Sequence, residues 1–484
     1  MKKIFCLLII LIIFGAASSY AIPLEKQNIS NAFYENILYV GGGGPGNYTN
    51  IQDALDAASE GDTVFVYDDS SPYNENILIE KTVELIGENK ETTVINGDSA
   101  GSVIVILAEY VLITGFSIQM TGISEGNAGI SVRNNHSIIT DNIILNNDWG
   151  ISIYYTVYCT VIGNRFLNNN CGLYIRSQGN TIKENQFFND GIYVSTSGNI
   201  IEDNTANYKP IIYLEGENNN LIDYECGQII LVDCSCITIQ NLRITKTDTG
   251  IILSNCENCH IVANDILNCK SGIKLVNSNY NNLSYNDLYQ NKNTGITLSG
   301  SDYNTLEHNI CSEHLLGKYR YHGLYLEGAD NNTIKNNIFM DNNVGIGCSV
   351  SDDNIISENS ISDNIYIGII LEGQCERNSI KTNRIKGISV GMVLDDIGFN
   401  YILNNDFYEN NENIRIEVLQ LHKIRLFQMV KISGNYWDKA RILPKFILGV
   451  YDYVYDEDIP WGGGFRISWI YVDWHPAKEH NFQS

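Results

Sequence analysis

Positive charge is scarce in this sequence. The chain of 484 residues has 31 lysines and arginines against 56 aspartates and glutamates, a formal net charge of −25. Binding to nucleic-acid phosphates needs a basic surface, so we expect no nucleic-acid partner. An acidic surface instead favours solubility and association with divalent cations or cationic partners.

Apolar runs of membrane length are also absent after the first residues. The N-terminal run, residues 4–14, follows Lys2 and Lys3 and precedes the small residues Ser19 and Ala21. This run is shorter than the roughly 20 residues of a membrane-spanning helix, and its flanks are typical of a secretory signal peptide. We therefore expect a signal peptide over residues 1–21, no transmembrane segment, and a location outside the cytoplasmic membrane, either secreted or at the cell envelope.

A short phrase of the form Gly-Ile-x-Leu is what the sequence has in abundance. Successive copies begin at Gly295, Gly323, Gly345, Gly368 and Gly391, at steps of 28, 22, 23 and 23 residues. Earlier copies begin at Gly129, Gly150, Gly172, Gly191, Gly250 and Gly272. Two more short apolar phrases follow each of the five later copies, and a fixed period of this length is the signature of a solenoid. The pattern predicts an all-β fold, a single-stranded right-handed parallel β-helix with three short strands in each rung of about 22 residues.

Asparagine recurs at one place in the repeat and predicts a structural column. Its members are Asn142, Asn164, Asn185, Asn204, Asn241, Asn264, Asn286, Asn309, Asn337, Asn359, Asn383 and Asn405. Asparagine tolerates the left-handed backbone that a sharp corner needs, and stacked side-chain amides can hydrogen-bond along the column.

The two ends of the chain depart from the repeat and are expected to form caps. Residues 37–102 contain short strands and, over residues 48–58, apolar residues at helical spacing, which predicts a helix that closes the first rungs. The repeats then occupy residues 103–413. Residues 414–484 form a tail with Trp437, Trp461, Trp469 and Trp474, interpreted as a cap over the last rung or, alternatively, as a platform for sugars or a partner.

These features together resemble a known family. The helix-capped opening, followed by Tyr73-Asn-Glu75, is similar to the N-terminal cap of secreted β-helix proteins such as pectin methylesterases. The later Gly434-Asn-Tyr-Trp-Asp438 sequence is similar to the terminal box of NosD-type proteins. The chain is thus identified as a member of the NosD-type, or carbohydrate-binding and sugar-hydrolysis (CASH), group of pectin-lyase-like β-helices. The resemblance implies an exported protein that binds carbohydrate, and its name implies a link to copper delivery.

The catalytic blocks of related β-helix enzymes do not transfer to this chain. The sequence lacks the Asn-Thr-Asp and Gly-His-Gly blocks of polygalacturonases, the later blocks of pectin methylesterases and the Asp-Pro-His of mannuronan epimerases. The Asp352-Asp353 and Arg384-Ile-Lys386 matches are short enough to arise by chance in such a repeat. Noncatalytic binding is therefore favoured over an enzyme, and the alternative is a polysaccharide lyase or glycoside hydrolase.

Outward-facing tyrosines provide a candidate binding surface. Tyr174, Tyr193 and Tyr213 fall at the same place in successive copies, and Arg176 and Glu215 flank them. Stacked tyrosines can pack against a sugar ring, or they can simply pack on one another. We interpret these five residues as candidate ligand-binding residues.

Carboxylates four residues after the phrase's glycine are the best catalytic candidates. They are Glu327, Glu372 and Asp395, and Glu372 and Asp395 should lie on adjacent rungs, about 4.8 Å apart. Such a pair could act as acid and base or bind Ca²⁺, or it could be solvated. Asp302, Asp330 and Asp352 form another column, expected to make local turn hydrogen bonds.

Cysteines cluster in two neighbouring rungs. Without Cys6 of the signal peptide, the 12 cysteines become eleven, and this odd count leaves at least one thiol unpaired. The alignment predicts Cys234 beside Cys256 and Cys236 beside Cys259. Disulfides or a stack of free thiols are favoured, and a four-thiolate metal site is the alternative.

The 28-residue step marks an insertion over residues 311–322. It contains His314, Lys318, Arg320 and His322, and His308 lies just before it. Insertions in solenoids often form functional loops, although this one could also be neutral. His308, His314 and His322 are the candidate copper ligands.

The preferred interpretation is a monomeric cell-surface or extracellular protein that binds a polysaccharide or glycoprotein without catalysis. A polysaccharide-acting enzyme and a metal accessory protein remain the alternatives. No cofactor is required by this reading, and Ca²⁺ is favoured over copper as a candidate ion.

Overall fold

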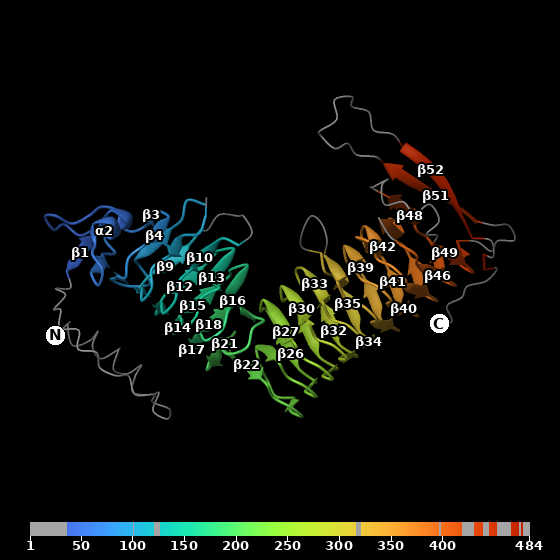
Figure 1. Ribbon diagram of the computed structural model, residues 1–484, viewed down its shortest axis with the longest axis horizontal. Helices are drawn as coiled ribbons and strands as arrows, with labels where there is room; N and C mark the ends of the chain where they lie inside the picture. The colour runs from blue at the N-terminus through green and yellow to red at the C-terminus, as the bar shows by residue number, and fades with distance from the viewer. Residues whose placement is uncertain are drawn as a thin grey trace. The chain divides into compact units, whose positions relative to one another are not determined.

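The structure is a computed structural model. It describes residues 36–99, 101–120, 126–315, 321–395, 398–418, 430–438, 445–452, 466–473 and 476–477. These residues form two stacks of coils, which we call the N-coil (residues 37–206) and the C-coil (residues 209–473), each with three sheets (Figure 1). The signal peptide expected over residues 1–21 lies outside the described residues.

The N-coil consists of sheets N1, N2 and N3, in which all neighbouring strands are parallel. Sheet N1 contains β1 (Ile37–Val40), β2 (Thr63–Val66), β5 (Glu84–Gly87), β8 (Leu112–Thr114), β11 (Ile138–Thr140), β14 (Thr160–Ile162), β17 (Thr181–Lys183) and β20 (Ile200–Glu202). Sheet N2 contains β4 (Ile77–Ile79), β7 (Ile104–Ile106), β10 (Ala128–Val132), β13 (Trp149–Tyr154), β16 (Cys171–Arg176) and β19 (Ile192–Val194). Sheet N3 contains β3 (Tyr73–Asn74), β6 (Val94–Asn96), β9 (Ser117–Gln119), β12 (Ile143–Leu145), β15 (Arg165–Leu167), β18 (Gln186–Phe188) and β21 (Thr205–Ala206).

The C-coil consists of sheets C1, C2 and C3, parallel except for the final β51–β52 pair. Sheet C1 contains β22 (Lys209–Glu215), β24 (Gln228–Val232), β27 (Thr249–Ser254), β30 (Ser271–Val276), β33 (Thr294–Ser299), β36 (His322–Glu327), β39 (Val344–Ser349), β42 (Ile367–Glu372), β45 (Val390–Asp395), β48 (Glu412–Val418), β51 (Lys445–Asp452) and β52 (Arg466–Asp473). Sheet C2 contains β23 (Leu221–Ile222), β25 (Thr238–Gln240), β28 (His260–Val262), β31 (Asn282–Ser284), β34 (Thr305–Glu307), β37 (Thr333–Lys335), β40 (Ile355–Ser357), β43 (Ser379–Lys381), β46 (Tyr401–Leu403) and β49 (Lys431–Ser433). Sheet C3 contains β26 (Arg243–Thr245), β29 (Asp265–Leu267), β32 (Asp287–Tyr289), β35 (Ile310–Ser312), β38 (Ile338–Met340), β41 (Ser360–Ser362), β44 (Arg384–Lys386), β47 (Asp406–Tyr408) and β50 (Tyr436–Trp437).

The apolar residues of the repeated phrase fill the interior, as the alternation predicts. In neighbouring rungs Ile130 pairs with Ile151 and Ile151 with Leu173, and all three side chains are fully buried. The helix α2 (Ile51–Ala57) buries Ile51, Ala54 and Leu55 against the first rungs. The predicted parallel β-helix and its N-terminal helix are thus confirmed.

The asparagine column forms an internal hydrogen-bond ladder. The backbone N–H of each member donates to Oδ1 of the next asparagine at 2.8–3.1 Å, from Asn142 to Asn204 and from Asn264 to Asn435. Positive φ falls on the residue before each asparagine of the ladder, such as Asp141 (53°) and Glu358 (58°). The prediction that the column members themselves adopt the left-handed conformation is therefore wrong for all of them except Asn241, whose φ is 57°.

The prediction that Asn241 belongs to this column is wrong by one residue. It is exposed, and Leu242 occupies the column instead, with its N–H donating to Asn264 Oδ1. Leucine is tolerated at this position because β26 is the first strand of sheet C3. No earlier rung of that sheet needs a side-chain acceptor there.

The two coils meet where the strand direction reverses. Strand β22 pairs antiparallel with β21, and then parallel with β24. The outward residues Ile211, Ile230 and Ile252 of sheet C1 pack into the hydrophobic core of the N-coil. Apolar residues at these outward positions are the sequence signal for this junction.

Polar side chains of the C-coil bind backbone groups on the last two strands of sheet N2, β16 and β19. Gln228, fully buried, accepts a hydrogen bond from Ile192 N–H at 2.9 Å and donates to the Ile192 carbonyl at 2.8 Å. Asp248 Oδ2 accepts from Gly172 N–H at 2.8 Å. These contacts satisfy backbone groups that the next parallel strand would otherwise bind.

A pair of buried carboxyl groups lies in this junction. Asp190 is fully buried and takes an asparagine position in a second internal ladder, where Asn169 Nδ2 donates to its Oδ2 at 2.8 Å. Burial and repulsion from Asp248 raise the pKa of Asp190 to about 8. Burial also raises the pKa of Asp248.

The last rung of the C-coil is hydrogen-bonded to Asp473, near the end of the chain. Trp437 is buried and stacks on Phe407 with ring centroids 5.0 Å apart. Its Nε1–H and the Asn435 N–H both donate to Asp473 Oδ2, at 3.0 and 3.1 Å. Trp437 therefore is not part of an exposed platform, while Trp461 and Trp474 lie outside the described residues.

Candidate functional site

Three aromatic rings stack along the outer face of sheet N2. Tyr174 and Tyr193 pair in register, with ring centroids 5.1 Å apart and planes 8° from parallel. Trp149 stacks on Tyr174 as well, with ring centroids 4.3 Å apart and planes 12° from parallel, so that Tyr174 is the middle ring of the three. Lys274 Nζ, from β30 of the C-coil, lies 5.0 Å from the Tyr193 ring centre. The stack thus runs to the junction between the coils.

A groove of about 510 Å³ opens beside this stack. Ser131, Ser152 and Tyr174 occupy the same column on β10, β13 and β16. The surface is hollowed because two small serines precede the large tyrosine in that column. The groove is lined by Gly126, Ser131, Arg133, Trp149, Ser152, Tyr154, Tyr155, Tyr174 and Arg176.

Two arginines lie on the groove in the column next to the serines. Arg176 pairs in register with Tyr154, and its guanidinium carbon lies 5.8 Å from the Tyr154 ring centre. Arg133 follows β10 in the same column, and its Nε donates to Ser131 Oγ at 3.2 Å. Both arginines are exposed. Aromatic surface, hydroxyl groups and guanidinium groups therefore converge on one hollow.

The stacked tyrosines remain protonated over the physiological pH range. Burial raises the pKa of Tyr174 and of Tyr193. Their hydroxyl groups are therefore available as neutral hydrogen-bond donors and acceptors.

Tyr213 does not belong to this stack, and this part of the prediction is wrong. Tyr213 lies on β22 and pairs with Ile230, because the chain reverses between β21 and β22. Its hydroxyl donates to Glu215 Oε2 at 2.6 Å. Both residues thus lie on the C-coil and do not line the groove.

Sequence reasoning missed Trp149, Tyr154, Tyr155 and Arg133. Trp149 stands directly before the phrase at Gly150, and Tyr154 and Tyr155 follow it. Aligning only the tyrosine position of the phrase does not detect these residues, because the groove is also lined by residues directly before and after the phrase.

The predicted carboxylates lie in one column at the ends of the C1 strands. Glu327 pairs with Ser349, and Ser349 with Glu372. Leu371 pairs with Leu394, so that Glu372 and Asp395 follow on adjacent rungs, as predicted. This column lies on the C-coil, and none of its members lines the groove of sheet N2. The catalytic role assigned to them stays a prediction.

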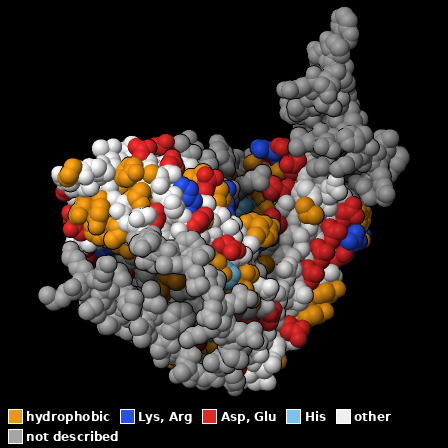
Figure 2. Space-filling model, turned by 60° about the vertical axis from the view of Figure 1, so that its left-hand side comes forward, with side chains coloured by type: hydrophobic (Ala, Val, Ile, Leu, Met, Phe, Trp, Pro, Cys, Tyr) orange, Lys and Arg blue, Asp and Glu red, His pale blue; other side chains and the backbone are white. Residues whose placement is uncertain are grey.

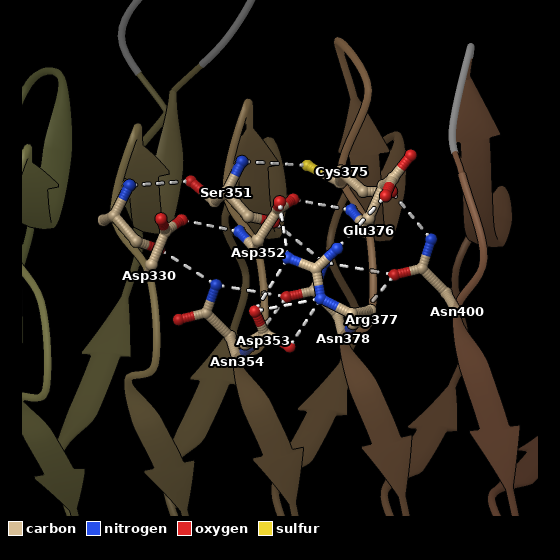
Figure 3. A network of polar contacts seen from close by, with 11 residues as sticks. Asp330, Ser351, Asp352, Asp353, Asn354, Cys375, Glu376, Arg377, Asn378 and Asn400 are labelled. Atoms are coloured by element: carbon tan, nitrogen blue, oxygen red, sulfur yellow. Dashed lines mark hydrogen bonds and ion pairs between the residues drawn. The ribbon is translucent and has the colours of Figure 1, made fainter.

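A second acidic column crosses the turns of the C-coil. Asp352 N–H donates to Asp330 Oδ1, and Glu376 N–H donates to Asp352 Oδ1, both at 2.7 Å (Figure 3). The predicted local turn bonds are thus replaced by bonds between rungs. Arg377 forms ion pairs with Asp352, Asp353 and Glu376 at 2.8–3.1 Å.

Figure 2 shows acidic side chains gathered in a band on one side of the molecule, with basic side chains more scattered.

The four cysteines are free thiols with a stacking order that differs from the prediction. Cys234, Cys256 and Cys259 are buried in the core, whereas Cys236 is exposed. Val232 pairs with Ser254, and this register places Cys234 beside Cys256, as predicted. The predicted Cys236–Cys259 pair is wrong, because Ser235 pairs with Glu257 and this register places Cys236 beside Asn258.

The three candidate histidines occupy separate environments. His308 is exposed and stacks on Tyr285, 4.9 Å between ring centroids. His314 is fully buried in an internal ladder, where its Nδ1 accepts from Asn291 N–H at 3.2 Å, and burial lowers its pKa to about 3. His322 is buried and stacks on Tyr325. Lys318 and Arg320 lie outside the described residues.

Comparison with known protein families identifies the chain. A family model described as "Periplasmic copper-binding protein (NosD)" matches residues 55–224, 207–346 and 314–441. The chain belongs to the NosD family. The resemblance carried by the cap and the repeats is thus confirmed.

Solved structures similar to this NosD-family protein are distant. The A-module of the Azotobacter vinelandii mannuronan C-5 epimerase AlgE6 is 14% identical, with 75% of this chain and 90% of that chain covered and a TM-score of 0.24. The DFA-IIIase from Arthrobacter chlorophenolicus A6 without its lid is 14% identical, with coverages of 76% and 94% and a TM-score of 0.28. The periplasmic alginate epimerase AlgG is 13% identical, with coverages of 77% and 84% and a TM-score of 0.27. No curated protein matches the chain.

The family description implies copper, and the described residues do not fit a copper centre. Among them, no three His, Cys, Asp or Glu side chains converge on a point that could hold a metal ion. The buried position of His314 within the ladder and the core position of Cys256 agree with this finding. Within the same residues, no helix is long and apolar enough to cross a membrane.

Proposed function

We propose that this NosD-family protein binds a glycan, without catalysis, in the groove on sheet N2. The observation that carries the proposal is the stack of Trp149, Tyr174 and Tyr193 beside a hollow floored by serines. Flat aromatic faces pack against the apolar faces of sugar rings, and hydroxyl groups hydrogen-bond to the sugar hydroxyls. The stack is held in place by strand pairing, so little order is lost when a ligand binds.

The proposed location is outside the cytoplasmic membrane. The expected signal peptide and the word "periplasmic" in the family description support it. The proposed ligand is then a polysaccharide or a glycoprotein of the cell envelope or its surroundings.

Replacing Trp149 or Tyr174 by alanine should weaken glycan binding by about 10- to 100-fold, the usual effect of removing a central aromatic contact. The measurement is a glycan-array screen of the mature protein, followed by calorimetric titration of the hits. Tyr280→Ala is the matched control, because Tyr280 stacks on Tyr303 in the same way, 5.0 Å and 9°, but lies on the C-coil away from the groove.

Two results would contradict this proposal. Equal loss of binding in Tyr280→Ala and Tyr174→Ala would mean that the groove is not the site. Release of reducing ends from a bound polysaccharide, lost in Glu372→Gln, would show an enzyme that uses the C1 carboxylates.

A further inference from the structure

We propose that the glycan bound in the N2 groove is anionic, with carboxylate or sulfate groups on its sugar units that bind Arg133 and Arg176. The inference rests on the proposed glycan-binding function and specifies the chemical class of its ligand. It is carried by the charge of the groove, which is opposite to that of the chain.

The groove is a basic patch on an acidic protein. The chain carries a formal charge of −25, yet the described residues that line the groove include two arginines and no aspartate or glutamate. Asp148, close in sequence to Trp149, accepts hydrogen bonds from Gly126 N–H and Asn170 Nδ2. A neutral ligand would not need a positively charged groove on a negatively charged protein, whereas an anionic ligand would.

Within the described residues the two groove arginines form no ion pair, in contrast to three arginines elsewhere in the chain. Arg165, Arg377 and Arg415 each form ion pairs with carboxylates. Among the described ion pairs, neither Arg133 nor Arg176 has a carboxylate partner. Arg133 uses one of its five N–H donors on Ser131, which leaves donors for a ligand.

The positions of the arginines suit a chain of charged sugars. Arg133, directly after β10, and Arg176, on β16, occupy one column two rungs apart, so their backbones are separated by about 10 Å. Tyr154 lies between them, and its ring supports the guanidinium of Arg176. The planar guanidinium can bind a carboxylate or sulfate through two parallel hydrogen bonds. This arrangement can bind charges on alternate units of a sugar chain that lies along the aromatic stack.

The test compares charged and neutral forms of the same polymer. Suitable probes are homogalacturonan with its methyl ester, and dextran sulfate with dextran. We expect the wild-type protein to bind at least one charged form, with about 10-fold or greater preference over its neutral counterpart, and binding should weaken between about 50 and about 500 mM NaCl. Arg133→Gln and Arg176→Gln should each reduce affinity for the charged form by about 10-fold.

The matched control is Arg243→Gln, which removes the same charge from an exposed arginine on β26 of the C-coil. It should leave the affinity unchanged, and an equal loss in this variant would overturn the inference by showing a non-specific charge effect. Equal affinity for charged and neutral forms would overturn the inference and leave the proposed function intact. Failure to bind any glycan, charged or neutral, would overturn both.

Discussion

Replacing Asn359 by alanine should lower the free energy of unfolding by about 3–5 kcal/mol, because four buried hydrogen bonds of its side chain are lost. Asn359 is fully buried in the middle of the C-coil ladder. Its Oδ1 accepts from both the backbone N–H and Nδ2 of Asn337, at 2.9 and 3.1 Å. Its Nδ2 donates to the Ile334 carbonyl at 2.9 Å and to Asn383 Oδ1 at 3.0 Å. Alanine also leaves a small cavity, which adds to the loss.

The measurement is urea denaturation of the variant and the wild type, monitored by circular dichroism. Asn220→Ala is the control, because Asn220 is exposed and lies outside the ladder. A change below about 1 kcal/mol in Asn359→Ala would show that the ladder contributes little to stability. Asn359→Leu, which fills the cavity, separates the two effects, since any remaining loss then comes from the hydrogen bonds.

Replacing Asp190 by asparagine should stabilise the protein near pH 8 by a few kcal/mol. Asparagine fits the position, because Asn147 and Asn169 occupy the equivalent places on the two preceding rungs. The new amide could donate to the carbonyl of Phe166, which corresponds in register to Ile144, the acceptor for Asn169. The change also removes a buried carboxyl group that Asp248 repels.

The stabilisation should depend on pH. The pKa of Asp190 rises from 3.8 to about 8 on folding. The folded protein therefore retains a proton that the unfolded chain releases, and wild-type stability falls as the pH rises from about 4 to about 8. At 1.36 kcal/mol for each pKa unit, the upper bound of this loss is about 5–6 kcal/mol. The variant should lack this component of the pH dependence.

Denaturation midpoints measured at several pH values test this expectation. Asp223→Asn, at an exposed position, is the matched control. A pH profile that is the same in wild type and Asp190→Asn would show that Asp190 does not retain its proton. A variant that is less stable than the wild type at pH 8 would show that the junction requires the carboxyl group.

The junction between the two coils also contacts the strands that carry the groove's tyrosines. Asp190 immediately precedes the phrase that carries Tyr193, and Asp248 accepts a hydrogen bond from Gly172, two residues before Tyr174. Lys274 of the C-coil lies over the Tyr193 ring. The end of the aromatic stack is therefore supported by the same contacts that join the two coils.

The candidate site was predictable only in part. Tyr174 and Tyr193 are predictable because they repeat at one position of the phrase, and Arg176 because it flanks them. Trp149 and Arg133 were missed because they lie at neighbouring positions, and residues from several positions share a groove only once the strands stack. Tyr213 was wrongly included because a periodic pattern does not reveal a reversal of strand direction.

The parallel β-helix, its period and one internal asparagine column follow from the sequence alone. A repeat of about 22 residues with alternating apolar positions can bury its side chains only by stacking on its neighbours. The break at β21 and β22 and the hollow beside Trp149 become visible only in the folded structure. These features depend on which surfaces of different rungs meet, and on the size of side chains that are distant in sequence, so no local pattern specifies them.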